Sequence, residues 1–206
     1  MLPYLILGAT YAFAAAVQPG PYQTYLISQA LSHGWRRTLP AALAPLLSDV
    51  PIILLVVFVL SRLPFALAEA LRCAGGVFLL YLAWRAFRTW RAYRLAAEDS
   101  AATARRSLLS AALVNLLNPN PYLGWSLVMG PLLLKGWRET PAHGIALLVA
   151  FYGTMVVASM GIIALFAGAR SLGPRVARGL VGISAVALAC FGGWQLWSGA
   201  RRLLGG

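Results

Sequence analysis

Residues 18–22 read Gln-Pro-Gly-Pro-Tyr, and residues 118–122 read Asn-Pro-Asn-Pro-Tyr. Each stretch interrupts a long apolar segment, and each places two prolines around a small residue, between an amide and a tyrosine. Because proline has no backbone N–H and cannot continue a helix normally, each stretch predicts a break inside a helix. The two stretches lie 100 residues apart, and residues 34–41 have a similar echo at residues 136–142. The sequence therefore predicts an internal repeat.

The composition places these breaks in a membrane protein. Of 206 residues, 60% are hydrophobic and only 11% are charged, whereas ordinary globular chains have roughly 25% charged residues. The mean hydropathy is +0.75, and about six apolar stretches approach the ~20 residues that a helix needs to cross a bilayer. We expect an all-α membrane protein with six transmembrane helices.

The expected spans form two groups of three. The first repeat, residues 1–95, has spans at about 2–32, 39–60 and 64–87; a cytoplasmic linker follows at 96–107; the second repeat, residues 108–206, has spans at about 108–134, 142–169 and 177–203. A short loop is expected at 33–37. Since three is an odd number, the second group enters the membrane from the opposite side. The repeats are therefore predicted to be inverted, with helices 1 and 4 broken.

The net charge of +12 suggests nucleic-acid binding at first, because Lys and Arg neutralise phosphates. The basic residues lie between the spans, however, so we expect no nucleic-acid partner. Loops one, three and five hold eleven of them and the opposite side holds six. Positively charged loops remain in the cytoplasm, which predicts that both termini lie outside.

Four arginines, Arg85, Arg88, Arg91 and Arg94, recur every three residues among aromatic side chains. Two interpretations stay open for this stretch. It is either an interfacial helix that binds anionic lipid headgroups or a solvated loop that only sets the orientation of the chain.

Asp49 is the acid that falls in the middle of a predicted span. An ionisable group at such a depth costs about 2.5 to 3.5 kcal/mol and indicates a function. Burial disfavours the charged carboxylate, so we expect Asp49 either to take up and release protons during transport or to bind a substrate ammonium group. The alternative is a structural acid that is hydrogen-bonded across the bundle. The repeat offset places Phe151 and Tyr152 at the equivalent position of the second repeat.

The breaks themselves predict a binding site. Unwound backbone leaves donors and acceptors that hydrocarbon cannot satisfy, whereas a polar substrate can. Helix N-termini suit a carboxylate and C-terminal carbonyls suit an ammonium group, so a zwitterion such as an amino acid fits both. Kinks that serve packing alone are the simpler alternative. The predicted substrate-binding residues are Gln18, Pro19, Gly20, Pro21, Tyr22, Asn115, Asn118, Pro119, Asn120, Pro121, Tyr122 and Tyr152, with Asp49 for proton coupling.

Other functions find less support in the sequence. No catalytic nucleophile with a base, nucleotide loop or metal-ligand cluster is evident, so we expect neither an enzyme nor a cofactor or metal. Cys73 and Cys190 lack a C-x-x-C spacing and predict neither a disulfide nor a zinc site. A six-span thiol-disulfide or electron carrier remains the main alternative, and a scaffold protein is a third. Small residues such as those at 74–76 predict close helix packing and a homodimer.

The chain resembles the LysE/RhtB family of amino-acid exporters. The resemblance rests on residues 19–21, Gly34, Asp49, the Gly-Gly and Tyr-Leu pairs at 75–82, and Asn118-Pro119. It implies a bacterial inner-membrane exporter of amino acids or their derivatives, driven by protons, with half-sites at the two breaks and Asp49 as the family's acid. Departures occur at Ala44, Pro45, Ala83 and Asn120, so the substrate of a relative cannot be transferred.

Overall fold

A computed structural model describes residues 1–18, 20–56, 65–91 and 100–204, and every regular element in these ranges is a helix. This confirms the all-α prediction. The elements are α1 (Leu2–Val17), α2 (Pro21–His33), α3 (Trp35–Thr38), the 3-10 helix η1 (Leu39–Leu43), α4 (Ala44–Leu54), α5 (Phe65–Arg91), α6 (Ser100–Leu116), α7 (Pro119–Gly124), the π-helix η3 (Trp125–Met129), α8 (Gly130–Glu139), α9 (Pro141–Gly168), the 3-10 helix η4 (Ala169–Leu172) and α10 (Pro174–Leu204).

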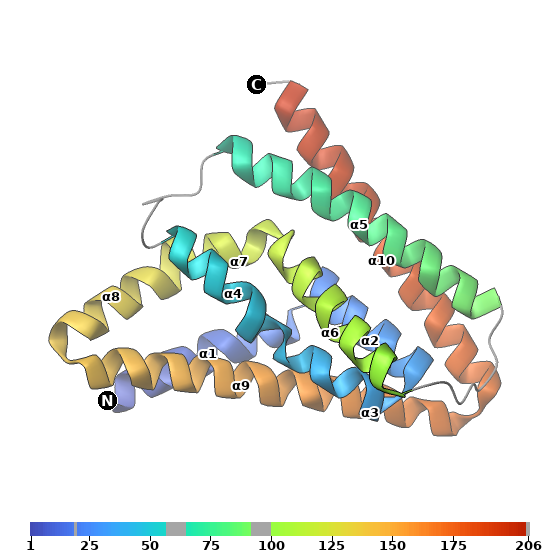
Figure 1. The fold of residues 1–206 in the computed structure, drawn as a ribbon, viewed down its shortest axis with the longest axis horizontal. Helices are drawn as coiled ribbons and strands as arrows, with labels where there is room; N and C mark the ends of the chain where they lie inside the picture. The colour runs from blue at the N-terminus through green and yellow to red at the C-terminus, as the bar shows by residue number, and fades with distance from the viewer. Residues whose placement is uncertain (19, 57–64, 92–99, 205–206) are drawn as a thin grey trace.

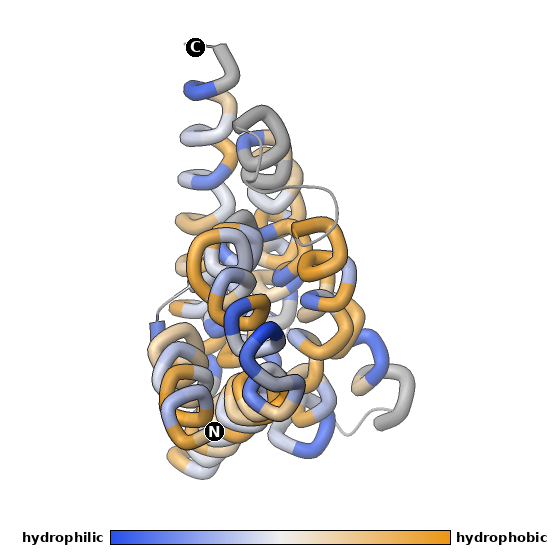
Figure 2. The backbone as a smooth tube through the Cα atoms, turned by 90° about the vertical axis from the view of Figure 1, so that its left-hand side faces the viewer, coloured by the Kyte–Doolittle hydropathy of each residue, from blue (hydrophilic) through white to orange (hydrophobic). Residues whose placement is uncertain are grey.

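Three helical segments of the described residues are long and apolar enough to cross a membrane: Trp35–Leu54, Pro141–Leu172 and Arg178–Arg202. Hydrophobic residues dominate the helices (Figure 2), and large apolar side chains point outward from them, including Val157 and Leu165, 69% and 71% exposed. α1, with 16 residues, is roughly 24 Å long and shorter than the ~30 Å hydrocarbon core. Apolar spans are therefore confirmed, and the six-span inverted repeat stays a prediction.

The chain leaves helical geometry between α1 and α2. Gln18 is extended, with ψ 125°, because a residue that precedes a proline avoids the helical region. Gly20 is also extended, and α2 begins at Pro21, where a missing N–H costs nothing. Pro19 lies outside the described residues.

A second interruption separates α6 from α7. Asn118 is extended, with φ −87° and ψ 126°, and α7 begins at Pro119. The Asn118 side chain caps the new helix, since its Oδ1 accepts a hydrogen bond from the Asn120 N–H at 3.1 Å. The interruption is followed by one turn of α-helix and then by η3.

One predicted loop is corrected by the structure. The sequence predicts a loop at 33–37, whereas the turn takes the single residue Gly34 and α3 begins at Trp35. Gly34 has φ +80°, which only glycine adopts without strain, so one residue reverses the chain. α8 continues to Glu139, past the predicted end of span four at 134, and the bounds of that span stay a prediction.

The region between the repeats is more helical than predicted. The sequence predicts a linker at 96–107, whereas residues 100–107 form the first turns of α6. α5 continues through Arg91, so the loop interpretation of the arginine stretch is wrong for residues 85–91. Alanine and arginine, which occur in both stretches, have high helix propensity. Arg94 lies outside the described residues.

The helices pack in three main groups (Figure 1). α5 and α10 form an antiparallel pair, α1 lies along α9, and α6 packs against α3, η1 and α4. α2 lies at the centre and contacts α6, α9 and α10. Two buried apolar clusters result. The first joins α2 with η1, α5, α6 and α10, and the second joins α1 with α4, η3 and α9.

The close contact between α5 and α10 depends on glycine residues, which have no side chain. A Cβ atom at Gly76 would lie 2.7 Å from the Leu196 backbone nitrogen, and one at Gly192 would lie 2.9 Å from the Gly76 carbonyl oxygen. The predicted role of residues 74–76 in close helix packing is therefore confirmed at Gly76.

We predict that Gly76→Val lowers the unfolding temperature of the detergent-purified protein, because the added atoms force α5 and α10 apart at a cost of about 1–3 kcal/mol. Gly193→Val is the matched control, since a Cβ there meets no atom within 4 Å. Equal thermal denaturation curves for the two variants would contradict this account of the contact.

Candidate functional site

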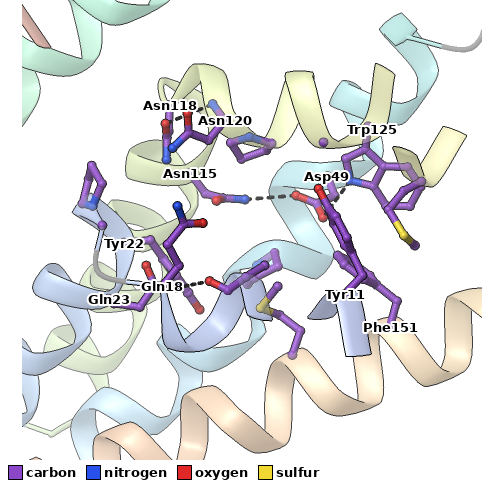
Figure 3. A pocket seen from close by; sticks show the side chains of 18 residues that line it. Tyr11, Gln18, Tyr22, Gln23, Asp49, Asn115, Asn118, Asn120, Trp125 and Phe151 are labelled. Carbon is purple, nitrogen blue, oxygen red and sulfur yellow. Dashed lines mark hydrogen bonds between the residues drawn. The ribbon is translucent and has the colours of Figure 1, made fainter. Parts of the chain in front are cut away.

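A cavity of about 140 Å³ lies where the two interruptions approach each other. Figure 3 shows its wall as a mixture of amide, aromatic and methionine side chains. The lining residues are Tyr11, Ala15, Gln18, Gly20, Pro21, Tyr22, Gln23, Pro45, Asp49, Asn115, Asn118, Asn120, Pro121, Gly124, Trp125, Met129, Phe151 and Met155. A hollow with polar groups in a largely apolar wall is thus lined by elements that are far apart in the sequence.

The Asp49 carboxyl group forms the most polar part of the wall, although it is only 3% exposed. Three neutral donors from three elements reach it. Asn115 Nδ2 donates to Oδ1 at 3.0 Å, and Trp125 Nε1 and the Tyr152 hydroxyl donate to Oδ2 at 3.2 Å and 3.3 Å. In Figure 3, Asn115 and Trp125 approach the carboxyl from opposite sides. The acid is thereby held in position by three neutral donors.

Asn115 links α6 to α4 through two adjacent residues. Besides Asp49, its Nδ2 donates to the Ser48 Oγ at 2.8 Å, and Ser48 in turn donates to the Ala44 carbonyl at 3.0 Å. Ser48 and Asn115 are both buried. The amide therefore has a structural as well as a chemical role, because it holds the acid and its helix against α6.

Other side chains support the first interruption. Gln23 Nε2 donates to the Ala15 carbonyl at 3.1 Å, which satisfies an acceptor that the end of α1 leaves without a helical partner. The Tyr22 hydroxyl donates to the Ala41 carbonyl at 3.1 Å. These contacts join α2 to both α1 and η1 beside the cavity.

The structure brings most of the sequence-predicted residues together. Gln18, Gly20, Pro21, Tyr22, Asn115, Asn118, Asn120, Pro121 and Asp49 line the cavity, and Tyr152 contacts Asp49. Tyr122 is buried in the second apolar cluster rather than in the cavity wall. α7 begins at Pro119, and Pro19 lies outside the described residues. Most of the predicted residues therefore lie around one cavity, and their role in binding is a proposal.

Sequence reasoning missed several lining residues, above all Trp125, Tyr11 and Gln23. The sequence did offer a sign that Trp125 matters, because the repeat offset pairs it with another aromatic residue, Tyr25. Tyr11 and Gln23 gave none, since a tyrosine and a glutamine in apolar helices have many uses. Within the described residues, no group of three or more His, Cys, Asp or Glu side chains is placed to hold a metal ion.

The fold and the cavity together define a class, that of helical membrane proteins with a buried acid and interrupted helices around a polar hollow. A model of the LysE type translocator family matches residues 13–198, and the chain belongs to this family. The resemblance drawn from the sequence motifs is thereby confirmed. Comparison with curated proteins and with solved structures gives no match.

Family membership makes the chain a multi-pass membrane transporter. The members of the family move solutes and are not enzymes, which agrees with the expectation that this chain catalyses no reaction.

We predict that Asn115→Ala destabilises the purified protein by about 1–3 kcal/mol, because it leaves Asp49 with one donor fewer. In the Asp49→Asn background the loss should be smaller, with a coupling of at least about 0.5 kcal/mol in a double-mutant cycle. Ser184→Ala is the control, since that hydroxyl bonds only to its own helix at Leu180. Additive effects of the Asn115 and Asp49 changes would sink this interpretation.

Proposed function

We propose that the chain exports an amino acid or a similar small zwitterionic metabolite from a bacterial cell, coupled to proton movement. One observation carries the proposal: a single cavity is lined by residues of both interruptions and by the buried acid Asp49. Sites at the midplane between discontinuous helices are typical of secondary transporters.

The size and lining of the cavity support a small polar substrate. A cavity of about 10–15 Å³ is enough to hold one water molecule, so 140 Å³ leaves room for a small solute. Five side-chain amides face it, from Gln18, Gln23, Asn115, Asn118 and Asn120. Amides recognise polar groups at a lower desolvation cost than ions do.

The charges around the cavity match a zwitterion. Asp49 provides an acceptor for an ammonium group, and Tyr22 and Gln23 in the first turn of α2 lie in the same wall, where the partial positive charge of a helix N-terminus favours a carboxylate. No arginine or lysine is among the lining residues. The positive partner of a charged Asp49 therefore has to come from the substrate or from a proton.

Packing supports the inverted repeat as part of the proposal. α1 packs against α9, the second span of the other repeat, and α6 packs against α3, η1 and α4, which form the second span of the first repeat. The third spans, α5 and α10, pack against each other. This reciprocal pattern is what a two-fold relation between the repeats requires.

The proposed location is the bacterial inner membrane with both termini outside. It rests on the excess of basic residues in loops one, three and five, since such loops remain in the cytoplasm. The homodimer stays a prediction from the many small residues.

We predict that Asp49→Asn abolishes proton-driven transport. In proteoliposomes loaded with a labelled substrate, an imposed pH gradient should accelerate flux through the wild type and fail to do so through the variant, a loss of at least about tenfold. Glu139→Gln is the control, because that acid is exposed and pairs with His143. A variant that keeps full proton-driven flux with the same pH dependence rules out coupling at Asp49.

The alternative function, a thiol-disulfide or electron carrier, requires reactive cysteines at the site. Cys73 and Cys190 are both free thiols, and they belong to α5 and α10. Neither lines the cavity. The geometry therefore favours transport of a solute over thiol exchange.

A screen with labelled amino acids tests the cavity and the alternative together. Gln18→Ala and Asn118→Ala should each reduce efflux of the best substrate from cells by about tenfold, as expected for the loss of one buried hydrogen bond. Asn118→Ser separates binding from capping, because serine keeps an oxygen for the Asn120 N–H. The double variant Cys73→Ala/Cys190→Ala should export normally. If it is inactive while Gln18→Ala and Asn118→Ala export like the wild type, the carrier function replaces ours.

A further inference from the structure

An apolar groove of about 590 Å³ lies on the outer face of the α5–α10 pair, away from the transport cavity. Its walls include Phe87 and Trp90 of α5 and Gly182, Ile183 and Val186 of α10. The glycine creates the space for the indole, since a Cβ at Gly182 would lie 3.0 Å from Trp90 Cδ1. Ile183 and Val186 are 66% and 64% exposed, so the groove opens toward whatever surrounds the helices.

A guanidinium group is fixed at the mouth of this α5–α10 groove. The Arg178 Cζ lies 5.4 Å from the Trp90 ring centroid, and its Nε donates to the Trp90 carbonyl at 3.1 Å. This carbonyl lies at the end of α5, where such contacts are favourable. The bond uses Nε, so the N–H groups of the two Nη atoms remain for phosphate oxygens.

Further positive charge surrounds the same end of the pair. Arg88, Arg91 and Arg175 are exposed, and the Arg88 Cζ lies 5.1 Å from the Trp84 ring centroid. These residues belong to the end of α5 and the start of α10, which the proposed orientation places at the cytoplasmic face. That face of a bacterial membrane carries anionic lipids.

We propose that the α5–α10 groove binds one anionic phospholipid, with an acyl chain along Ile183 and Val186 and the phosphate on Arg178. The combination of an apolar groove and a positive mouth suits such a lipid. A second copy of the chain is a poorer occupant, because it would bring arginines against arginines in a protein with 17 basic and 5 acidic residues. The proposal does not depend on the transport function.

The test compares lipids on the detergent-purified full chain. Phosphatidylglycerol should raise the unfolding temperature and be retained in native mass spectra, and phosphatidylcholine should do so less. Arg178→Gln should weaken phosphatidylglycerol binding about fivefold, the effect of one arginine near an anionic surface, and remove the preference. Arg201→Gln is the matched control, because its guanidinium also stacks on a tryptophan of α10, Trp197, at 5.4 Å.

A second variant covers the structural role of Arg178. Ile183→Trp fills the groove from an exposed position and should reduce retention of phosphatidylglycerol without unfolding the protein. Four results would each overturn the proposal: equal effects of the two lipids, normal binding by both variants, stabilisation by glycerol 3-phosphate as strong as by the lipid, or a dimer that forms through the groove and excludes lipid.

Discussion

A carboxyl group surrounded by apolar helices has to be supplied with hydrogen-bond donors, and this requirement at Asp49 organises the centre of the protein. The donors come from Asn115, Trp125 and Tyr152, so α6, η3 and α9 must all converge on α4. Because each donor is neutral, the site keeps an uncompensated acid beside an open cavity. Burial makes the charged form of Asp49 costly, so this carboxylate attracts a proton or a cationic group.

The two interruptions are stabilised by different means. The second is capped by its own residue, since Asn118 accepts a bond from the Asn120 N–H. The helix after the first interruption has Gly20 as its N-cap, which offers no side chain, and a side chain from that helix, Gln23, satisfies a carbonyl of α1. The motif of the second repeat is therefore stabilised by a hydrogen bond within the motif, and that of the first repeat by a hydrogen bond between two helices.

Local chemistry explains how much the sequence could predict. The extended residues Gln18 and Asn118 follow directly from the prolines beside them. The repeat offset identified Tyr152 as the counterpart of Asp49 in the second repeat, whereas the hydrogen bond between the two side chains was not predicted. The one-residue turn at Gly34 and the early start of α6 were missed. Both regions are rich in polar or basic residues, which occur in exposed loops and on exposed helix surfaces alike. Trp125 and Gln23 reach the site only through tertiary packing, which no local pattern contains.

The π-helical segment η3 has a mechanical consequence. The Gly130 N–H bonds to the Trp125 carbonyl across five residues, and a Cβ at Gly130 would collide with that same oxygen. A π-turn holds one residue more than an α-turn, so its conversion to α-helix would swivel α7 by about 100° relative to α8. The Trp125 indole would then no longer donate its hydrogen bond to Asp49. A one-residue shift in the backbone hydrogen bonds of η3 would thus remove one of the three donors of the acid.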